Sequence, residues 1–350
     1  MKLWGLSAAA LVFGISSAVI ATQAPRLLLR AENGQGQAGS AASVPGSAPG
    51  PAKLTKAEDV RARLWQPAAG LVQLPLWPEG LRIQLPETAL PETTVVNIKG
   101  VAGRPWTAVR YVSRPTMTIY PPKGRNTGAA IMVFPGGGYE VLAIDLEGSE
   151  ICDWITAAGM TCILLKYRVP QDWHKDRQHE HAPAVQLPLQ DAQRAMGLIR
   201  QRATALNIDP HKIGVIGFSA GGHLVAAISN ADRRTYTPVD AADREPSRPD
   251  FAIALYPGHL WSGQGVGLSP WNAISRDAPP TFLLQSMNDP VDDVHHAIAY
   301  ALALRDAKVP VEMHLYAEGG HAFGLRPTPF VITTEWPKLV EKWLHTIKAL

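Results

Sequence analysis

The sequence has only two cysteines among its 350 residues, Cys152 and Cys162. Neither belongs to a Cys-x-x-Cys pair or shows a metal-ligand spacing, which argues against a thiolate metal site and against thiol chemistry. An exported protein can pair such cysteines. However, Cys152 lies in an expected helix and Cys162 in the strand after it, and such neighbours seldom offer the geometry that a disulfide requires. We therefore expect two free, buried thiols.

The chain also lacks dense clusters of one charge. It has 33 basic and 30 acidic residues, a formal net charge of +3, and no dense basic run. Nucleic acid is therefore not an expected partner. No internal repeat is visible either, which argues against propeller blades.

A long apolar run occurs only at the N-terminus, where Met1-Lys2 precedes the small, apolar stretch 3–21. We interpret residues 1–24 as a secretory signal peptide whose cleavage site is uncertain. Cleavage would give a periplasmic or secreted protein without stable membrane association. The run is also just long enough to remain as an uncleaved membrane anchor.

The remaining chain divides at about residue 92. Residues 25–91 are rich in small residues and proline and are interpreted as a disordered linker followed by an irregular segment. Residues 92–350 form the expected folded domain, in which strands alternate with helices. This pattern predicts an α/β fold, a mostly parallel sheet covered by helices on both faces. The expected strands are 94–98, 115–120, 129–134, 160–167, 212–218, 250–256, 280–285 and 309–316, and the expected helices are 149–159, 191–206, 220–229, 295–307 and 335–347.

The most specific motif is Gly217-Phe218-Ser219-Ala220-Gly221, at the end of an apolar run rich in β-branched residues. A G-x-S-x-G sequence between a strand and a helix is typical of a nucleophile elbow, which exposes a serine hydroxyl above a sheet. The two glycines leave room where the chain reverses. A chance match is disfavoured by the strand before the motif and the helical run after it, so Ser219 is the candidate nucleophile.

A serine nucleophile needs a base and an acid, which follow it in the order Asp or Glu, then His, in α/β-hydrolases. Asp289 comes just after the expected strand 280–285, and His321 lies on a glycine-rich loop after the expected strand 309–316. Asp292 and Asp293 are rival acids. We expect them to be less suitable, because a residue in the following helix would point away from the sheet edge.

Three consecutive glycines follow the expected strand 129–134. Backbone N–H groups of Gly137 and Gly138, together with that of Ala220, are the expected donors of an oxyanion hole, because glycines let a substrate oxygen approach the backbone. The alternative is a flexible glycine turn. With these donors the chemistry requires neither a metal nor a cofactor.

Histidines and tryptophans in loops suggest further possibilities. His174, His179 and His181 lie in a polar loop, but their spacing matches no helix-borne metal-ligand motif, so a metal site is the weaker interpretation. Trp173, Trp261 and Trp271 fall in loops near the expected active face. They could stack on sugar or feruloyl rings, and core or lid packing is an equally good account of each.

Taken together, the motifs resemble exported carboxylesterases of the α/β-hydrolase fold described as acetyl xylan esterases, including bifunctional feruloyl and acetyl esterases. The resemblance implies Ser219 as nucleophile, His321 as base, Asp289 as its orienting acid, and an oxyanion hole from the amides named above. The chain departs from the family in the polar, His-rich insertion 171–187, which should rim the pocket. The resemblance extends from about residue 115 to residue 350 and rests on FPGGGY (134–139), DLEG (145–148), KYRVP (166–170), LQDAQRA (189–195), GFSAGGHL (217–224) and EGGHAFG (318–324).

The sequence thus predicts a metal-independent serine esterase that removes small, acetyl-type acyl groups from plant polysaccharides or oligosaccharides. One alternative is a peptidase of the prolyl oligopeptidase type, although the N-terminal segment is too short for a propeller and lacks its repeats. Another is a catalytically silent hydrolase fold used for binding. The sequence does not predict the oligomeric state.

Overall fold

The computed structural model describes residues 64–85, 90–169 and 182–350. All of them belong to one compact unit, Leu54–Leu350. The expected signal peptide lies outside the described residues, as do Trp173 and the three histidines His174, His179 and His181. Within the described ranges, no helix is both long and apolar enough to cross a membrane.

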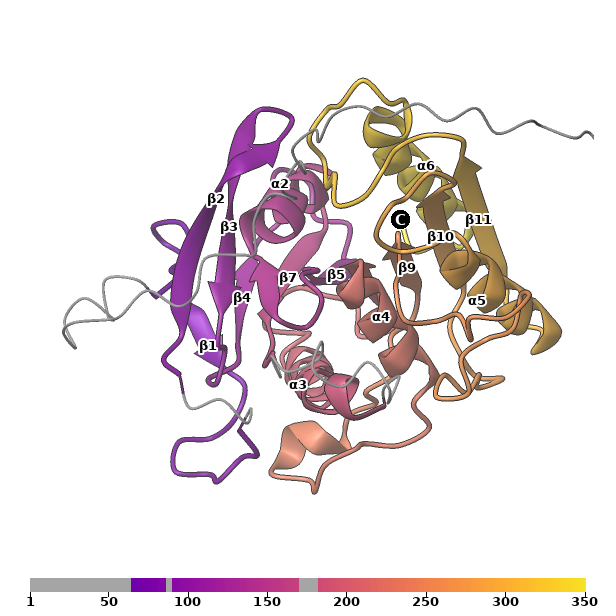
Figure 1. Ribbon diagram of the computed structural model, residues 1–350. Coiled ribbons are helices and arrows are strands. Elements are labelled where there is room, and N and C mark those ends of the chain that lie inside the picture. Colours follow the sequence, from indigo (N-terminus) through magenta and orange to yellow (C-terminus); the bar gives the residue numbers. More distant parts are fainter. Residues whose placement is uncertain (1–63, 86–89, 170–181) are drawn as a thin grey trace, which may run out of the picture. The chain divides into compact units, whose positions relative to one another are not determined.

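The described chain alternates between strands and helices (Figure 1). The helices are α2 (Glu150–Ala157), α3 (Ala182–Gln201), α4 (Ala220–Asn230), α5 (His295–Asp306) and α6 (Ile332–Thr346), with a π-helical turn η1 (Asp145–Ser149) and a 3-10 turn η3 (Ala241–Arg244). The strands are β1 (Gln73–Pro75), β2 (Thr93–Val101), β3 (Arg104–Arg110), β4 (Thr116–Tyr120), β5 (Ala130–Phe134), β6 (Val141–Ala143), β7 (Thr161–Lys166), β8 (Ile213–Phe218), β9 (Ala252–Leu255), β10 (Thr281–Ser286) and β11 (Val311–Tyr316).

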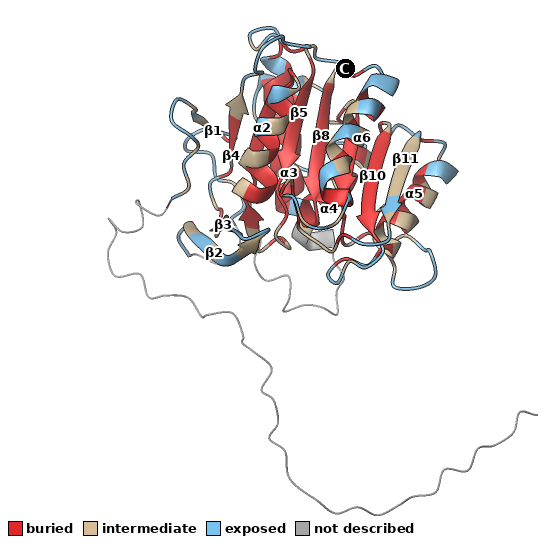
Figure 2. Cartoon of the chain, turned by 90° about the horizontal axis from the view of Figure 1, so that it is seen from above, coloured by how far each residue is buried: buried red, intermediate tan, exposed pale blue. Residues whose placement is uncertain are grey.

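An eight-stranded sheet in the order β1-β4-β7-β5-β8-β9-β10-β11 forms the centre of this unit. The strands from β7 to β11 in this order pair in parallel, and β4 and β1 are added antiparallel at one edge. Strands β5, β7, β8, β9 and β10 are buried along their whole length, as Figure 2 shows for several of them. Burial on both faces explains their continuous apolar sequences. The predicted mostly parallel sheet is confirmed.

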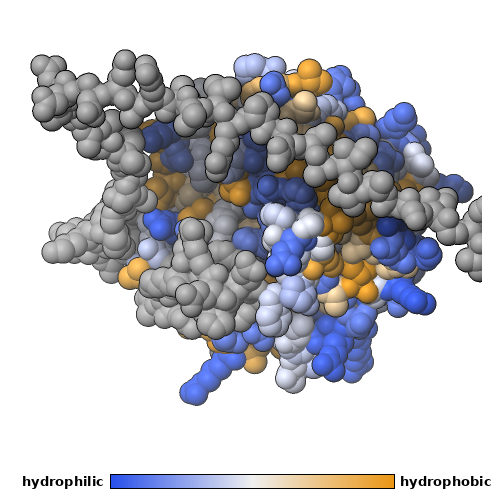
Figure 3. Space-filling model, turned by 45° about the vertical axis from the view of Figure 1, so that its right-hand side comes forward, coloured by the Kyte–Doolittle hydropathy of each residue, from blue (hydrophilic) through white to orange (hydrophobic). Residues whose placement is uncertain are grey.

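Helices cover both faces of this sheet. Successive residues of a strand point to opposite faces. At the end of β8, Gly217 lies against Val225 of α4, whereas the ring of Phe218 contacts Trp336 of α6 with centroids 6.2 Å apart. Helices α4 and α6 therefore lie on opposite faces. In the space-filling view, hydrophilic side chains line most of the right-hand outline of the described surface, and hydrophilic and hydrophobic side chains are mixed toward its middle (Figure 3).

The packed domain extends further toward the N-terminus than the expected boundary at residue 92. Strand β1 pairs antiparallel with β4, and the Trp77 Nε1–H donates a hydrogen bond to the buried Asp191 carboxylate at 2.8 Å. A strand of three residues is too short to leave a recognisable pattern in the sequence. Helix α3 likewise begins at Ala182 rather than at Asp191 and contains Pro188 in its interior. The predicted start at Asp191, after this proline, was therefore wrong.

A second, three-stranded sheet in the order β2-β3-β6 was only partly predicted. The expected strand 94–98 corresponds to β2, but β3 and β6 were missed. Strand β3 has exposed residues at its start and buried ones near its end. It therefore lacks the strict alternation by which half-buried strands are recognised.

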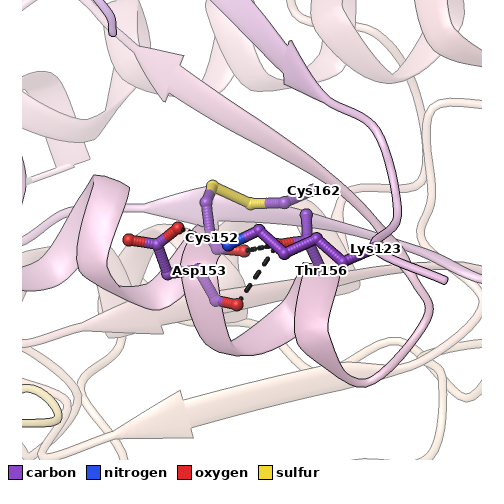
Figure 4. The surroundings of a disulfide bond; sticks show 5 residues. All are labelled: Lys123, Cys152, Asp153, Thr156 and Cys162. Carbon is purple, nitrogen blue, oxygen red and sulfur yellow. Dashed lines mark hydrogen bonds and ion pairs between the residues drawn. A yellow bond between two sulfur atoms is a disulfide. The ribbon is translucent and has the colours of Figure 1, made fainter.

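Cys152 of α2 and Cys162 of β7 form a disulfide, so the expectation of two free thiols was wrong (Figure 4). Their Cα atoms are 5.3 Å apart, a distance typical of disulfides. Helix α2 has only eight residues, and after a short turn the chain continues into β7, against which the helix packs. This direct packing of the helix on its own following strand brings the two buried cysteines together.

Replacing both cysteines with alanine is expected to lower the free energy of unfolding by about 2–3 kcal/mol, because the disulfide restricts the unfolded chain. Chemical denaturation of the variant and the wild-type protein measures this difference. Wild-type protein kept reduced should behave like the variant. An unchanged denaturation midpoint would contradict a stabilising disulfide.

Candidate active site

The G-x-S-x-G motif forms a tight turn between β8 and α4. Ser219 has φ 53° and ψ −120°, a left-handed conformation that is strained for a residue other than glycine. A Cβ atom at Gly217 would overlap the carbonyl oxygen of Gly221, and one at Gly221 would overlap that of Phe134. Both glycines are therefore required sterically, as the sequence predicted, and Ser219 lies just before the first residue of the helix.

His321 and Asp289 lie close together at the ends of neighbouring strands. His321 follows β11, Asp289 follows β10, and the His321 Nδ1 atom is 2.7 Å from Asp289 Oδ2. The side chain of Asp289 is fully buried. Its Oδ1 atom accepts backbone N–H groups from Val291 and Asp292 at 2.8 and 3.0 Å, and its Oδ2 atom also accepts a hydrogen bond from Gln285 Nε2 at 3.2 Å. The carboxylate is thus fixed in a position to orient the imidazole.

Asp292 also enters the site, contrary to the expectation that it points away. The Ser219 hydroxyl donates a hydrogen bond to Asp292 Oδ2 at 3.2 Å, and the same oxygen is 3.7 Å from His321 Nε2. The expectation placed Asp292 within a helix, but α5 begins only at His295. Asp292 lies instead in the preceding turn, which Asp289 holds through its backbone hydrogen bonds. As a result of this position, Asp292 and not His321 accepts the hydrogen bond of the Ser219 hydroxyl.

The charges of these groups influence one another. Burial raises the pKa of Asp292 to about 6; the charge of Asp289 acts in the same direction, whereas His321 and the hydrogen bond from Ser219 oppose it. Burial alone would lower the pKa of His321. The hydrogen bond to Asp289 and the nearby carboxylates outweigh burial and raise this pKa above its ordinary value. Each carboxylate near the imidazole thus favours the protonated form of His321.

Glu147 is a site residue to which the sequence analysis assigned no role. It belongs to the DLEG sequence and is 1% exposed. Its two carboxylate oxygens accept hydrogen bonds from the Gly136 N–H at 2.8 Å and from the Tyr256 hydroxyl at 2.9 Å. Burial raises the pKa of Glu147, against the opposing influence of His321 and of these hydrogen bonds. The sole hint of this role in the sequence is that Glu147 is an acidic residue within the short DLEG motif.

The glycine loop lies beside the serine. Gly137 and Gly138 have φ values of 131° and 63°, and both line the same pocket as Ser219. Among the described residues, no backbone carbonyl is bonded to the N–H of either glycine. The N–H of Ala220 is in the first turn of α4, where helices leave such groups without an intrahelical partner. The expected oxyanion donors thus surround the serine, and their catalytic role stays a prediction.

These groups open into a pocket of about 400 Å³. Trp106 of β3 lines it, whereas Trp261 stacks on His295 with centroids 4.7 Å apart and Trp271 is 61% exposed. Neither of these two tryptophans belongs to the lining. Across the described ranges, no group of three or more His, Cys, Asp or Glu residues is placed to hold a metal ion. The lining consists of Val101, Trp106, Gly137, Gly138, Ala143, Leu146, Glu147, Ser219, His259, Val291, Asp292, His321 and Ala322.

Known proteins are similar to this chain in both sequence and fold. Residues 117–255 match the BD-FAE family model. An acetylxylan esterase of Xylanibacter ruminicola is 30% identical over 249 residues, which cover 64% of this chain and 46% of that protein. An endo-1,4-beta-xylanase B of Butyrivibrio fibrisolvens is 28% identical over 55% of this chain and 32% of its own length. The chain thus spans less than half the length of these two curated relatives.

A solved structure matches more completely. The acetyl ester-xyloside bifunctional hydrolase of Caldicellulosiruptor lactoaceticus superimposes with a TM-score of 0.59 at 29% sequence identity. The match covers 80% of this chain and 97% of that structure. The fold, the elbow and these similarities agree: the chain has the α/β-hydrolase fold and is similar to acetylxylan esterases.

Proposed function

We propose that this protein is a serine carboxylesterase in which Ser219, His321 and Asp289 act as a catalytic triad. The observation that carries the proposal is the convergence of a strained serine, a carboxylate-oriented histidine and glycine amides on one pocket. These are the groups that acyl transfer requires. The names of the relatives support ester hydrolysis as the reaction.

The reaction proceeds through an acyl-enzyme. Ser219 Oγ attacks the ester carbonyl carbon while its proton passes to His321 Nε2, and the carbonyl oxygen takes the electron pair and binds to the amides of Gly137, Gly138 and Ala220. Collapse of this intermediate breaks the bond to the alcohol oxygen, which receives the proton from His321. Water then attacks the acyl-enzyme by the same route and releases the acid and the free serine. Before attack, the serine hydroxyl must turn from Asp292 to His321.

Acetyl-type esters of plant polysaccharides or oligosaccharides are the proposed substrates. The supporting observations are the acetylxylan esterase and the acetyl ester-xyloside hydrolase among the similar proteins, together with a pocket of modest size. Export is part of the proposal, since disulfides persist in oxidising compartments.

A substrate panel tests the function. Purified protein is assayed on p-nitrophenyl esters of increasing acyl length, on acetylated xylan and on a proline-linked peptide amide. We expect hydrolysis of acetyl esters, faster than of long-chain esters, and no cleavage of the amide. Cleavage of the amide alone would indicate a peptidase, and inactivity on every compound would indicate a binding protein.

A further inference from the structure

Asp292 lies in the pocket but takes no part in the reaction steps above. Its Oδ2 atom is 3.2 Å from Ser219 Oγ and 3.7 Å from His321 Nε2. In a serine esterase, the Nε2 atom returns its proton to the departing alcohol. A group beside both atoms therefore lies on the alcohol side of the ester, whereas the amides expected to hold the oxyanion belong to the loop after β5 and to the start of α4.

The local structure fixes the position of this carboxylate. The Asp292 N–H bonds to Asp289 at 3.0 Å, and its carbonyl oxygen accepts a hydrogen bond from Gln285 Nε2 at 2.6 Å. Gly258 lies directly against the side chain, because a Cβ atom there would come within 2.5 Å of Asp292 Oδ1. A glycine at position 258 thus leaves the space that the carboxylate fills.

Asp292 places a carboxylate on the alcohol side of the pocket. The titratable groups that act on it or line the same pocket are His321, Asp289, Glu147 and His259. No lysine or arginine lines the part of the pocket formed by described residues. The Asp292 side chain is itself largely buried, and a charge acts more strongly where water has little access to it.

We propose that Asp292 selects the alcohol part of the substrate, an inference that rests on the proposed esterase function. When a substrate displaces the Ser219 hydroxyl, the carboxylate accepts a hydrogen bond from a hydroxyl group next to the scissile ester. The same charge repels alcohols that carry a negative charge. The preferred class is therefore the neutral monoester of a vicinal diol or polyol, and esters of hydroxy acids are rejected.

Three acetate esters of similar size test this inference. Propyl acetate has no hydrogen-bond donor in its alcohol, 2-hydroxyethyl acetate has a hydroxyl group, and acetoxyacetate has a carboxylate. We expect the wild-type protein to prefer 2-hydroxyethyl acetate over propyl acetate by about two- to tenfold in kcat/KM, the contribution of one hydrogen bond. Acetoxyacetate should be poorer than propyl acetate by about ten- to a hundredfold, because its negative charge approaches the largely buried carboxylate of Asp292.

In Asp292→Asn the penalty on acetoxyacetate should fall to within about threefold, because the repelling charge is gone. Asp293→Asn is the matched control. Asp293 is also an acid but has a side chain that is 54% exposed and pairs with His295. This variant should keep the wild-type order and ratios.

The pH dependence of the wild-type protein gives a second measurement that needs no variant. Both neutral and anionic esters require a neutral His321, so the titration of His321 cancels in the ratio of their kcat/KM values. The ratio should report Asp292, whose pKa is about 6. The preference for the neutral ester over the anionic one should be greatest above this pH and should decrease below it. The corresponding ratio in Asp292→Asn should not vary with pH.

Wild-type ratios that persist in Asp292→Asn would overturn the inference. So would a pH-dependent ratio in that variant, because a titrating group other than Asp292 would then be responsible. These outcomes differ from a failure of the proposed function, in which none of the three esters is hydrolysed in a Ser219-dependent way. If Asp292→Asn does not fold, a wild-type ratio that is constant with pH contradicts the inference by itself.

Discussion

Replacing Ser219 with alanine is expected to reduce turnover of p-nitrophenyl acetate by about a million-fold, the loss typical of a missing triad nucleophile. The hydroxyl oxygen is the atom that forms the acyl-enzyme, and the neighbouring Asp292 carboxylate cannot form the same intermediate within the oxyanion hole. The backbone should not change, because alanine differs from serine only by the hydroxyl. Steady-state rates and a thermal unfolding curve measure the two properties.

Ser229→Ala provides the matched control for this experiment. Ser229 lies in the same helix, α4, is fully buried, and has a hydroxyl oxygen without a hydrogen-bond partner among the described residues. Its replacement should leave the rate close to that of the wild-type protein. If Ser219→Ala retained a tenth of the activity, the assignment of the nucleophile would be wrong.

Asp289→Asn is expected to lower kcat by about four orders of magnitude with little change in KM, as in other triads whose acid is replaced by its amide. The amide oxygen can keep the backbone hydrogen bonds of the carboxylate. Its NH₂ group then faces His321 Nδ1 and favours the tautomer with Nε2 protonated, which cannot accept the serine proton. Rates at saturating and limiting substrate separate kcat from KM.

The pH profile supplies an independent readout of the same variant. Activity should rise with pH as His321 loses its proton, with a midpoint above the ordinary value because the pKa is raised. Loss of the Asp289 charge and hydrogen bond should move this midpoint to lower pH. Asp293→Asn should leave both kcat and the midpoint unchanged. A crippling Asp292→Asn beside a harmless Asp289→Asn would transfer the role of orienting acid to Asp292.

The sequence was most informative where burial and sterics act on neighbouring residues. The central strands are continuous apolar runs because helices cover both of their faces. The elbow glycines are required by contacts within the turn itself and with the neighbouring strand. Chain order then placed Asp289 and His321 at adjacent strand ends, and the structure brings these two side chains within 2.7 Å.

Features that depend on the exact course of a turn or on distant packing were not predictable in this way. The inward direction of Asp292 follows from hydrogen bonds that Asp289 makes to the next backbone amides, and no spacing rule encodes them. Glu147 acquires its importance from partners at Gly136 and Tyr256, which lie 11 and 109 residues away. The disulfide required knowledge of how α2 rests on β7.

Strand β1 and Trp77 have a practical consequence for any shortened form of the protein. Trp77 bonds to Asp191, and the guanidinium groups of Arg168 and Arg194 lie 5.6 and 5.9 Å from its ring. The Arg168–Asp191 ion pair is completely buried. Removal of all residues before 92 would expose this ionic cluster to water. It would also leave β4 as an exposed edge strand, and exposed edge strands promote association between molecules. Truncation from the N-terminus should therefore stop well before Gln73.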